Sequence, residues 1–287
     1  MGFKTHHSNE IVELPEAITA YLDKGNLFEQ VMQIEGKAFR DVPGRRTLQV
    51  QLGDQSYFIK QHFGVGWAEI FKNLLTIKLP ILGAKTEKLA IHKLNEIGIA
   101  TTPFVGFGER GYNPGSRESF LITKDLGNII SLEDLCLAWK KQPPPARFKR
   151  EMIVAVAKLA RNLHENGLNH RDFYLCHLCL DANNFETNYL EQNPIKLFLI
   201  DLHRMSIHKT PNHHDNMKDI AALYFSSMDI GLTPRDIARF KNYYLLNPLL
   251  ASNNFWLNVE NRANKLYAKF HSNKFQQRLS VEKSTIS

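Results

Sequence analysis

With 287 residues, a mass of 33.0 kDa and 43% hydrophobic residues, the chain can bury one large core or two smaller lobes, which argues against global disorder. Its formal charge of +7 predicts an anionic partner, and nucleic acid, an anionic lipid surface and a polyanionic glycolipid all fit that charge. No apolar run reaches the roughly 18–20 residues of a membrane-spanning helix, and no signal-peptide segment follows the polar start, so we expect a cytoplasmic protein.

The first third of the chain has the pattern of a β-rich unit. Residues 47–52 alternate polar and apolar, Gly53-Asp54 forms a turn, and residues 56–60 resume as a strand, which predicts a hairpin ending on Lys60. The next predicted elements are a helix over 67–79, a helix with Thr86 as N-cap that stops at Gly98, and strands over 102–108 and 119–123.

The pattern becomes helical after a turn or hinge at 124–128. A helix begins at Ser131 with acidic residues in its first turn, and residues 151–166 form an amphipathic helix that Gly167 caps. Further helices are predicted over 219–228 and from Thr233-Pro234. This order predicts an α+β chain with a β-rich N-terminal lobe (1–126) and a mainly helical catalytic lobe (127–287).

The strongest chemical pattern is His170-Arg171-Asp172 after a capped helix, followed 29 residues later by Asp201 at the end of an apolar strand. Phosphoryl transfer from ATP needs one carboxylate that takes the proton of the attacking hydroxyl and another that holds a divalent metal. Asp172 and Asp201 suit these two roles. Each motif alone has a plain alternative, a chance tripeptide or a turn former, but their order after the Lys60 hairpin indicates a kinase-type site.

The chain resembles the lipopolysaccharide core heptose(I) kinases of Gram-negative bacteria, within the protein-kinase-like superfamily. The similarity extends from about residue 35 to 245. The strings that carry it are Arg45-Arg46-Thr47-Leu48, Ser56-Tyr57-Phe58-Ile59-Lys60, Lys72-Asn73-Leu74-Leu75, Leu79-Pro80-Ile81-Leu82-Gly83-Ala84, Ser131-Leu132-Glu133-Asp134, Asn169-His170-Arg171-Asp172, Ile200-Asp201-Leu202-His203-Arg204 and Leu223-Tyr224-Phe225-Ser226-Ser227-Met228.

This resemblance implies a bilobal protein-kinase-like fold and a role for each matching residue. Lys60 would contact the phosphates of ATP, and Glu87 would pair with that lysine, with Glu69 as the rival carboxylate. The helix of Glu87 leads directly into the next strand, as the kinase order requires, which favours it over Glu69. His170 and Arg171 would support the catalytic loop, and Asp219 would hold the backbone of that loop.

Three departures from ordinary protein kinases affect the site. His177 stands where kinases carry a metal-binding asparagine, and imidazole suits Mn²⁺ better than Mg²⁺, so a packing role for it is an equal alternative. Asp201-Leu202-His203 lacks the glycine of the usual Asp-Phe-Gly. No glycine-rich loop precedes Lys60, and Arg45 and Arg46 either replace its phosphate contacts, bind an acidic acceptor, or are solvated charges on a strand edge.

The three cysteines, Cys136, Cys176 and Cys179, are too few for a disulfide framework. Cys176-His177-Leu178-Cys179 places three zinc-type ligands together, but no second Cys-x-x-Cys completes a structural zinc site. Buried thiols are therefore the favoured interpretation.

As a function, the resemblance implies transfer of the γ-phosphoryl group of ATP, with Mg²⁺ or Mn²⁺, to heptose I of the lipopolysaccharide inner core. Its partners would be that glycolipid, the anionic inner face of the inner membrane, and an acyl carrier protein. Phosphorylation of 3-deoxy-octulosonic acid or of protein tyrosine, and a pseudokinase scaffold, remain as alternatives. Nucleic acid is the least expected partner, because the basic residues do not form an aromatic-interleaved face.

Overall fold

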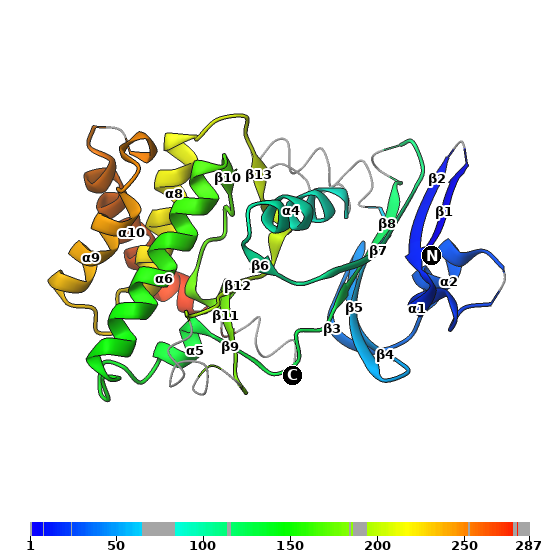
Figure 1. The fold of residues 1–287 in the computed structure, drawn as a ribbon, viewed down its shortest axis with the longest axis horizontal. Coiled ribbons are helices and arrows are strands. Elements are labelled where there is room, and N and C mark those ends of the chain that lie inside the picture. Colours follow the sequence, from blue (N-terminus) through cyan, green and yellow to red (C-terminus); the bar gives the residue numbers. More distant parts are fainter. Residues whose placement is uncertain are drawn as a thin grey trace. The chain divides into compact units, whose positions relative to one another are not determined.

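The protein is described from a computed structural model. The described residues are 2–7, 9–23, 25–64, 84–113, 116–183, 185, 194–251, 253–277 and 280 (Figure 1). They form two compact units, Met1–Asn128 with Ile200–Met205, and Ile129–Leu199 with Ser206–Ser287. The helix expected over 67–79 lies outside the described residues.

The first unit is built on a seven-stranded antiparallel sheet in the order β1-β2-β7-β8-β5-β4-β3. The predicted hairpin is confirmed, with β4 pairing residue by residue with β5 across the Gly53-Asp54 turn. The strands are β1 (Gly2–His7), β2 (Glu10–Pro15), β3 (Lys37–Val42), β4 (Arg45–Leu52), β5 (Gln55–His62), β7 (Phe104–Arg110) and β8 (Glu118–Lys124).

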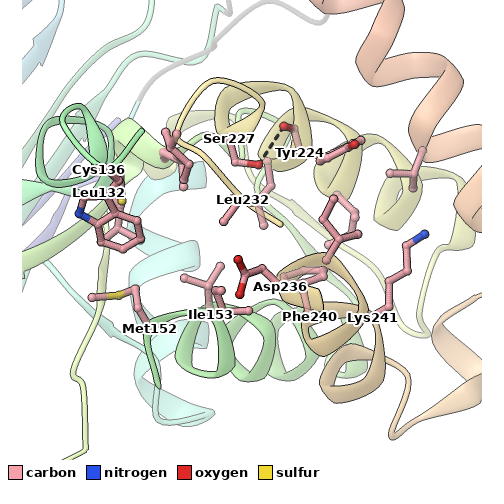
Figure 2. Close-up of a pocket in the computed structure, with 18 of the residues that line it drawn as sticks. Leu132, Cys136, Met152, Ile153, Tyr224, Ser227, Leu232, Asp236, Phe240 and Lys241 are labelled. Atoms are coloured by element: carbon pink, nitrogen blue, oxygen red, sulfur yellow. Dashed lines mark hydrogen bonds between the residues drawn. The ribbon is translucent and has the colours of Figure 1, made fainter. Parts of the chain in front are cut away.

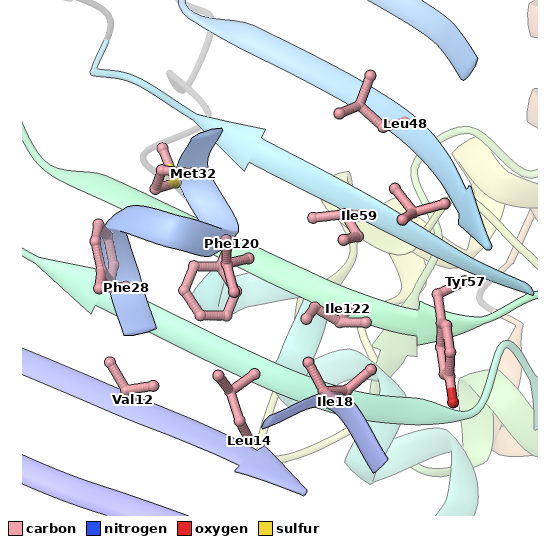
Figure 3. Close-up of a cluster of buried hydrophobic side chains, with 12 residues drawn as sticks. Val12, Leu14, Ile18, Phe28, Met32, Leu48, Tyr57, Ile59, Phe120 and Ile122 are labelled. Atoms are coloured by element: carbon pink, nitrogen blue, oxygen red, sulfur yellow. The ribbon is translucent and has the colours of Figure 1, made fainter. Parts of the chain in front are cut away.

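Short helices α1 (Glu16–Thr19) and α2 (Leu27–Gln33) supply apolar side chains to one face of this sheet (Figure 3). Phe28 of α2 packs on Phe120 of β8 with ring centroids 5.4 Å apart. Ile59 of β5 belongs to the same buried cluster. Because neighbouring strand residues point to opposite faces, Lys60 points to the other face.

Helix α4 (Lys85–Glu96) belongs to that other face, since its Glu87 reaches Lys60. Ala90, Ile91 and Leu94 are buried, and Gly98 follows the helix with φ 72°. The predicted N-cap at Thr86 is wrong. Ala84 occupies that position without a side-chain cap, and its own backbone N–H donates to Ser119 Oγ of β8 at 3.0 Å, which holds the start of α4 ahead of Thr86.

The strand expected over 102–108 is interrupted. The structure has β6 (Ala100–Thr101) and then β7 from Phe104, because Pro103 has no N–H to give to a ladder. η2 (Leu202–Arg204) completes the first unit and packs against α4.

The second unit is mainly helical, as the sequence predicted. Its long helix α6 (Ala146–Glu165) buries one amphipathic face and begins five residues earlier than expected, directly after Pro145. Helix α8 likewise begins at His213 because Asn212 caps it, and α9 opens with the predicted Thr233-Pro234 as a capping box.

Apart from α8 (His213–Ser227), α9 (Pro234–Tyr244) and α10 (Phe255–Phe270), the remaining elements of the second unit are short. They are β9 (Ile129–Ser131), α5 (Leu132–Cys136), β10 (Leu168–Asn169), η1 (Leu175–His177), β11 (Leu178–Asp181), β12 (Phe198–Leu199), β13 (Ser206–Ile207) and η3 (Pro248–Leu250). No helix in the described ranges is long and apolar enough to cross a membrane.

Candidate active site

Lys60 of β5 and Glu87 of α4 form an ion pair in the first unit. Lys60 Nζ lies 2.5 Å from Glu87 Oε1, and Glu87 is only 3% exposed. A carboxylate buried this deeply needs a cation beside it, so the pair fixes the lysine head group on the sheet face. The rival Glu69 lies outside the described residues.

Asp201 belongs to the same unit and lies beside this pair. Its backbone is left-handed (φ 60°, ψ 57°), and its Oδ1 is 4.0 Å from Lys60 Nζ. His203 Nδ1 lies 2.6 Å from the same oxygen, and because a carboxylate only accepts, Nδ1 donates the hydrogen bond. Sequence reasoning missed His203 as a site residue, although it follows Asp201 by two positions.

Arg45 and Arg46, predicted together, are separated by the alternation of β4. Arg45 lies on the face of Lys60, and its buried Nε atom has no hydrogen-bond partner among the described residues. Arg46 points to the opposite face, where its Nε donates to Gln61 Oε1 at 2.8 Å. Arg46 therefore does not join Lys60, and only Arg45 remains as a candidate phosphate ligand.

The surroundings of Arg45 are those of an anion site. Burial lowers the pKa of Arg45, and the charge of Arg40 lowers it further, while Glu87 and Asp201 act in the opposite direction. A guanidinium that is partly buried with an unused donor is ready to bind an oxyanion.

His62 is a second site residue that sequence reasoning missed. It follows Lys60 by two positions on β5, so it shares the same face, and it pairs with Arg45 across the ladder. Burial lowers its pKa to about 3, and the positive charges of Arg45, Lys60 and His203 add to the effect. His62 is therefore neutral at pH 7, and the period-two rule of the strand could have found it.

The second unit holds the loop of His170, Arg171 and Asp172. Asp219 of α8, which is 1% exposed, accepts hydrogen bonds from the backbone N–H groups of His170 and Arg171, both at 2.8 Å. Arg171 has a left-handed backbone (φ 69°), and the two bonds from the adjacent amides to one carboxylate hold the loop in that conformation.

His177, a predicted metal ligand, is tied to the same loop. Its Nδ1 lies 2.7 Å from the backbone oxygen of Asp172 and must donate to it, so that nitrogen is not a metal ligand. Among the described residues, no three His, Cys, Asp or Glu side chains converge as metal ligands. Burial raises the pKa of Cys179 to about 11 and that of Cys136 to about 12, so both thiols are protonated at neutral pH.

The predicted site residues thus fall into two groups. Lys60, Glu87, Asp201 and Arg45 belong to the first compact unit, and the Asp172 loop with its anchor Asp219 belongs to the second.

The second unit also contains an apolar pocket of about 100 Å³ (Figure 2). Helices α5, α6, α8, α9 and α10 line it. Its labelled walls include Met152 and Ile153 of α6 and Phe240 of α9 (Figure 2). The lining is mostly apolar, and its charged side chains are paired: Asp236 with Lys149 at 2.8 Å, and Lys241 with Glu260 at 3.0 Å.

The comparison with known proteins identifies the family of the chain. The model of the lipopolysaccharide kinase (Kdo/WaaP) family matches residues 29–244. The chain is 43% identical over 249 residues to the lipopolysaccharide core heptose(I) kinase WaaP of Pseudomonas aeruginosa, covering 84% of this chain and 90% of that protein. It is 44% identical over 239 residues to the protein of the same name from Escherichia coli K12, covering 83% and 89%.

Among solved structures, WaaP in complex with acyl carrier protein is similar, with a TM-score of 0.72 and 35% identity, covering 89% of this chain and 99% of that one. The predicted protein-kinase-like α+β fold is confirmed, with a β-rich first unit and a mainly helical second. The fold and the curated relatives define a kinase-like phosphotransferase. The chain belongs to the lipopolysaccharide kinase (Kdo/WaaP) family.

Proposed function

We propose that this protein transfers the γ-phosphoryl group of ATP to a hydroxyl of heptose I in the lipopolysaccharide inner core. Support comes from its family membership together with the paired Lys60 and the anchored Asp172 loop. Asp172 orients the acceptor hydroxyl and takes its proton, while Lys60 and Arg45 bind phosphate oxygens.

The residues on the Lys60 face fit ATP with a divalent cation. The unused Nε of Arg45 suits a phosphate oxygen, and the carboxylate of Asp201 is the oxygen donor that Mg²⁺ prefers. Bound Mg²⁺ neutralises charge on the transferred group. Glu87 and His203 keep Lys60 and Asp201 in place.

The test is phosphorylation of core lipopolysaccharide that lacks phosphate, using purified protein with ATP and Mg²⁺ and locating the new phosphate by NMR. Asp172→Asn should reduce kcat by about 10²–10⁴-fold while ATP binding persists. Asp54→Asn, in the exposed β4–β5 turn, is the matched control and should retain full activity. Unchanged turnover in the Asp172 variant would exclude Asp172 as the residue that takes the acceptor proton. Phosphate found on another sugar or on tyrosine would exclude heptose I as the acceptor.

An acyl carrier protein is the proposed partner of the second unit. The apolar pocket suits an acyl chain, and the segment 234–277 is strongly basic, which suits an acidic protein. Its charged residues are Arg235, Arg239, Lys241, Arg262, Lys265, Lys269 and Lys274 against Asp236 and Glu260.

Isothermal titration with acylated and unacylated carrier protein tests this partner. The acylated form should bind more tightly, and Ile153→Trp, which fills the pocket, should remove that difference. Equal affinity of the wild-type protein for both forms would refute the acyl contact.

Contact with an anionic membrane surface, proposed from the basic charge, is tested by sedimentation with anionic and neutral vesicles.

A further inference from the structure

Tyr244 carries a buried hydroxyl in a position that the proposed chemistry does not yet use. The residue ends α9, is fully buried, and its ring stacks between Phe240 and Phe255, both at 6.0 Å. Trp256 packs edge-on against the same ring at 5.9 Å. Packing alone would be served equally well by phenylalanine, so the hydroxyl needs its own explanation.

The hydroxyl of Tyr244 lies 2.8 Å from His164 Nδ1, and the other ring nitrogen of His164 lies 3.3 Å from Asp219 Oδ2. The direction of both bonds follows from chemistry. The Asp219 carboxylate can only accept, so Nε2 of His164 donates to it, and Nδ1 of that tautomer accepts from the Tyr244 hydroxyl. Burial raises the pKa of Tyr244, with Asp219 and Glu165 adding to the rise, so the hydroxyl keeps its proton.

This chain of hydrogen bonds ends on the loop of Asp172. Asp219 Oδ2 accepts hydrogen bonds from His164 Nε2 and from the backbone N–H of His170, and Oδ1 accepts one from the backbone N–H of Arg171. A buried carboxylate that accepts three bonds has its orientation set by all three donors. Removing the Tyr244 hydroxyl frees the His164 ring to take the other tautomer or to rotate, and Asp219 then loses one donor.

We propose that Tyr244 is a positioning residue for phosphoryl transfer, acting through His164 and Asp219 on the backbone that precedes Asp172. The hydroxyl selects the tautomer of His164, which completes the set of donors around Asp219. The link to catalysis rests on the proposed function, because it takes Asp172 as the residue that receives the acceptor proton. The effect on the loop backbone does not depend on that function.

The test is Tyr244→Phe, which keeps the stacked ring and deletes only the hydroxyl. Tyr243→Phe, one residue earlier on the exposed side of α9, is the matched control. Hydrogen exchange followed by mass spectrometry should give faster exchange, by about fivefold or more, in peptides that contain His170 and Arg171, with no change in peptides of the first unit. Turnover should fall by about the same factor while KM for ATP stays within about twofold.

A double-mutant cycle separates this chain of bonds from simple packing. His164→Phe keeps an aromatic ring but has neither a donor toward Asp219 nor an acceptor for the Tyr244 hydroxyl. The proposal expects that Tyr244→Phe adds no further loss in the His164→Phe background. Wild-type exchange of the loop amides in Tyr244→Phe, or an undiminished effect in the double variant, would overturn it. Faster exchange without any sugar kinase activity would keep the positioning role and reject the proposed reaction.

Discussion

The Lys60–Glu87 ion pair contributes both to stability and to the proposed chemistry. Glu87 is nearly inaccessible to water, and its buried charge is tolerated because Lys60 Nζ lies 2.5 Å away. Removing the cation leaves a buried carboxylate unpaired, whereas removing both charges leaves only an apolar contact.

Lys60→Met should therefore lower the free energy of unfolding by about 3–5 kcal/mol, and Lys60→Met/Glu87→Leu should recover most of it. Neither variant should bind ATP with wild-type affinity, because both lack the lysine that we propose as a phosphate ligand. Urea denaturation and isothermal titration measure the two effects separately. If Lys60→Met were as stable as the wild type, the burial of the Glu87 carboxylate would not depend on its pairing with Lys60.

His62 makes stability depend on pH. Its pKa is about 3 in the folded protein against an ordinary 6.5, so between these values the unfolded chain binds a proton that the folded protein refuses. The free energy of unfolding therefore falls as pH drops through this window and is fully retained above pH 6.5.

Replacing His62 with Gln should flatten this dependence. Between about pH 7 and pH 5, the wild type should lose on the order of 1–2 kcal/mol more than His62→Gln in urea titrations. The other histidines titrate in both proteins and cancel in the comparison. Parallel pH profiles would contradict the buried, neutral state of His62.

At the scale of elements, two helices end on glycines with the same backbone conformation but different surroundings. Gly98 follows α4 with φ 72°, and a Cβ there would meet no atom within 4 Å. Gly167 follows α6 with φ 69°, and a Cβ there would collide with the carbonyl oxygen of His208, whose N–H donates to Gly167 O.

Gly98→Ala should cost only the left-handed conformation, about 1–2 kcal/mol in the free energy of unfolding. Gly167→Ala should cost more, because the His208 carbonyl belongs to the backbone and the β10–β13 connection must move. Chemical denaturation of the two variants side by side tests this order. Equal losses would mean that the backbone near His208 yields easily.

The sequence predicted the elements whose signals are local. The β4–β5 hairpin, the amphipathic face of α6 and the capping box of α9 follow from alternation, period and cap residues. The start of α4 was misplaced because Ser119, which accepts a hydrogen bond from the N-cap residue Ala84, is distant in the chain. The opposite directions of Arg45 and Arg46 follow from strand alternation alone, whereas the pairing of His62 with Arg45 needed the strand register.

At the scale of the molecule, charge and apolar surface are unevenly distributed. The segment 234–277 has seven basic and two acidic residues, so it accounts for five of the seven net positive charges. Leu246, Leu249 and Leu257 in this segment are exposed by 66%, 73% and 56%, whereas Tyr244 and Phe255 of the same segment are buried.

Ile200–Met205 belongs to the first compact unit although it follows much of the second unit in the chain, and this affects how the gene can be divided. A fragment that ends at Asn128 would keep Lys60 and Glu87 but lose Asp201 and His203. In a hybrid of two relatives joined at that point, Lys60 would come from one parent and Asp201 from the other. A working exchange of the nucleotide-handling half must therefore move both stretches together, as a two-part cassette rather than a single N-terminal block.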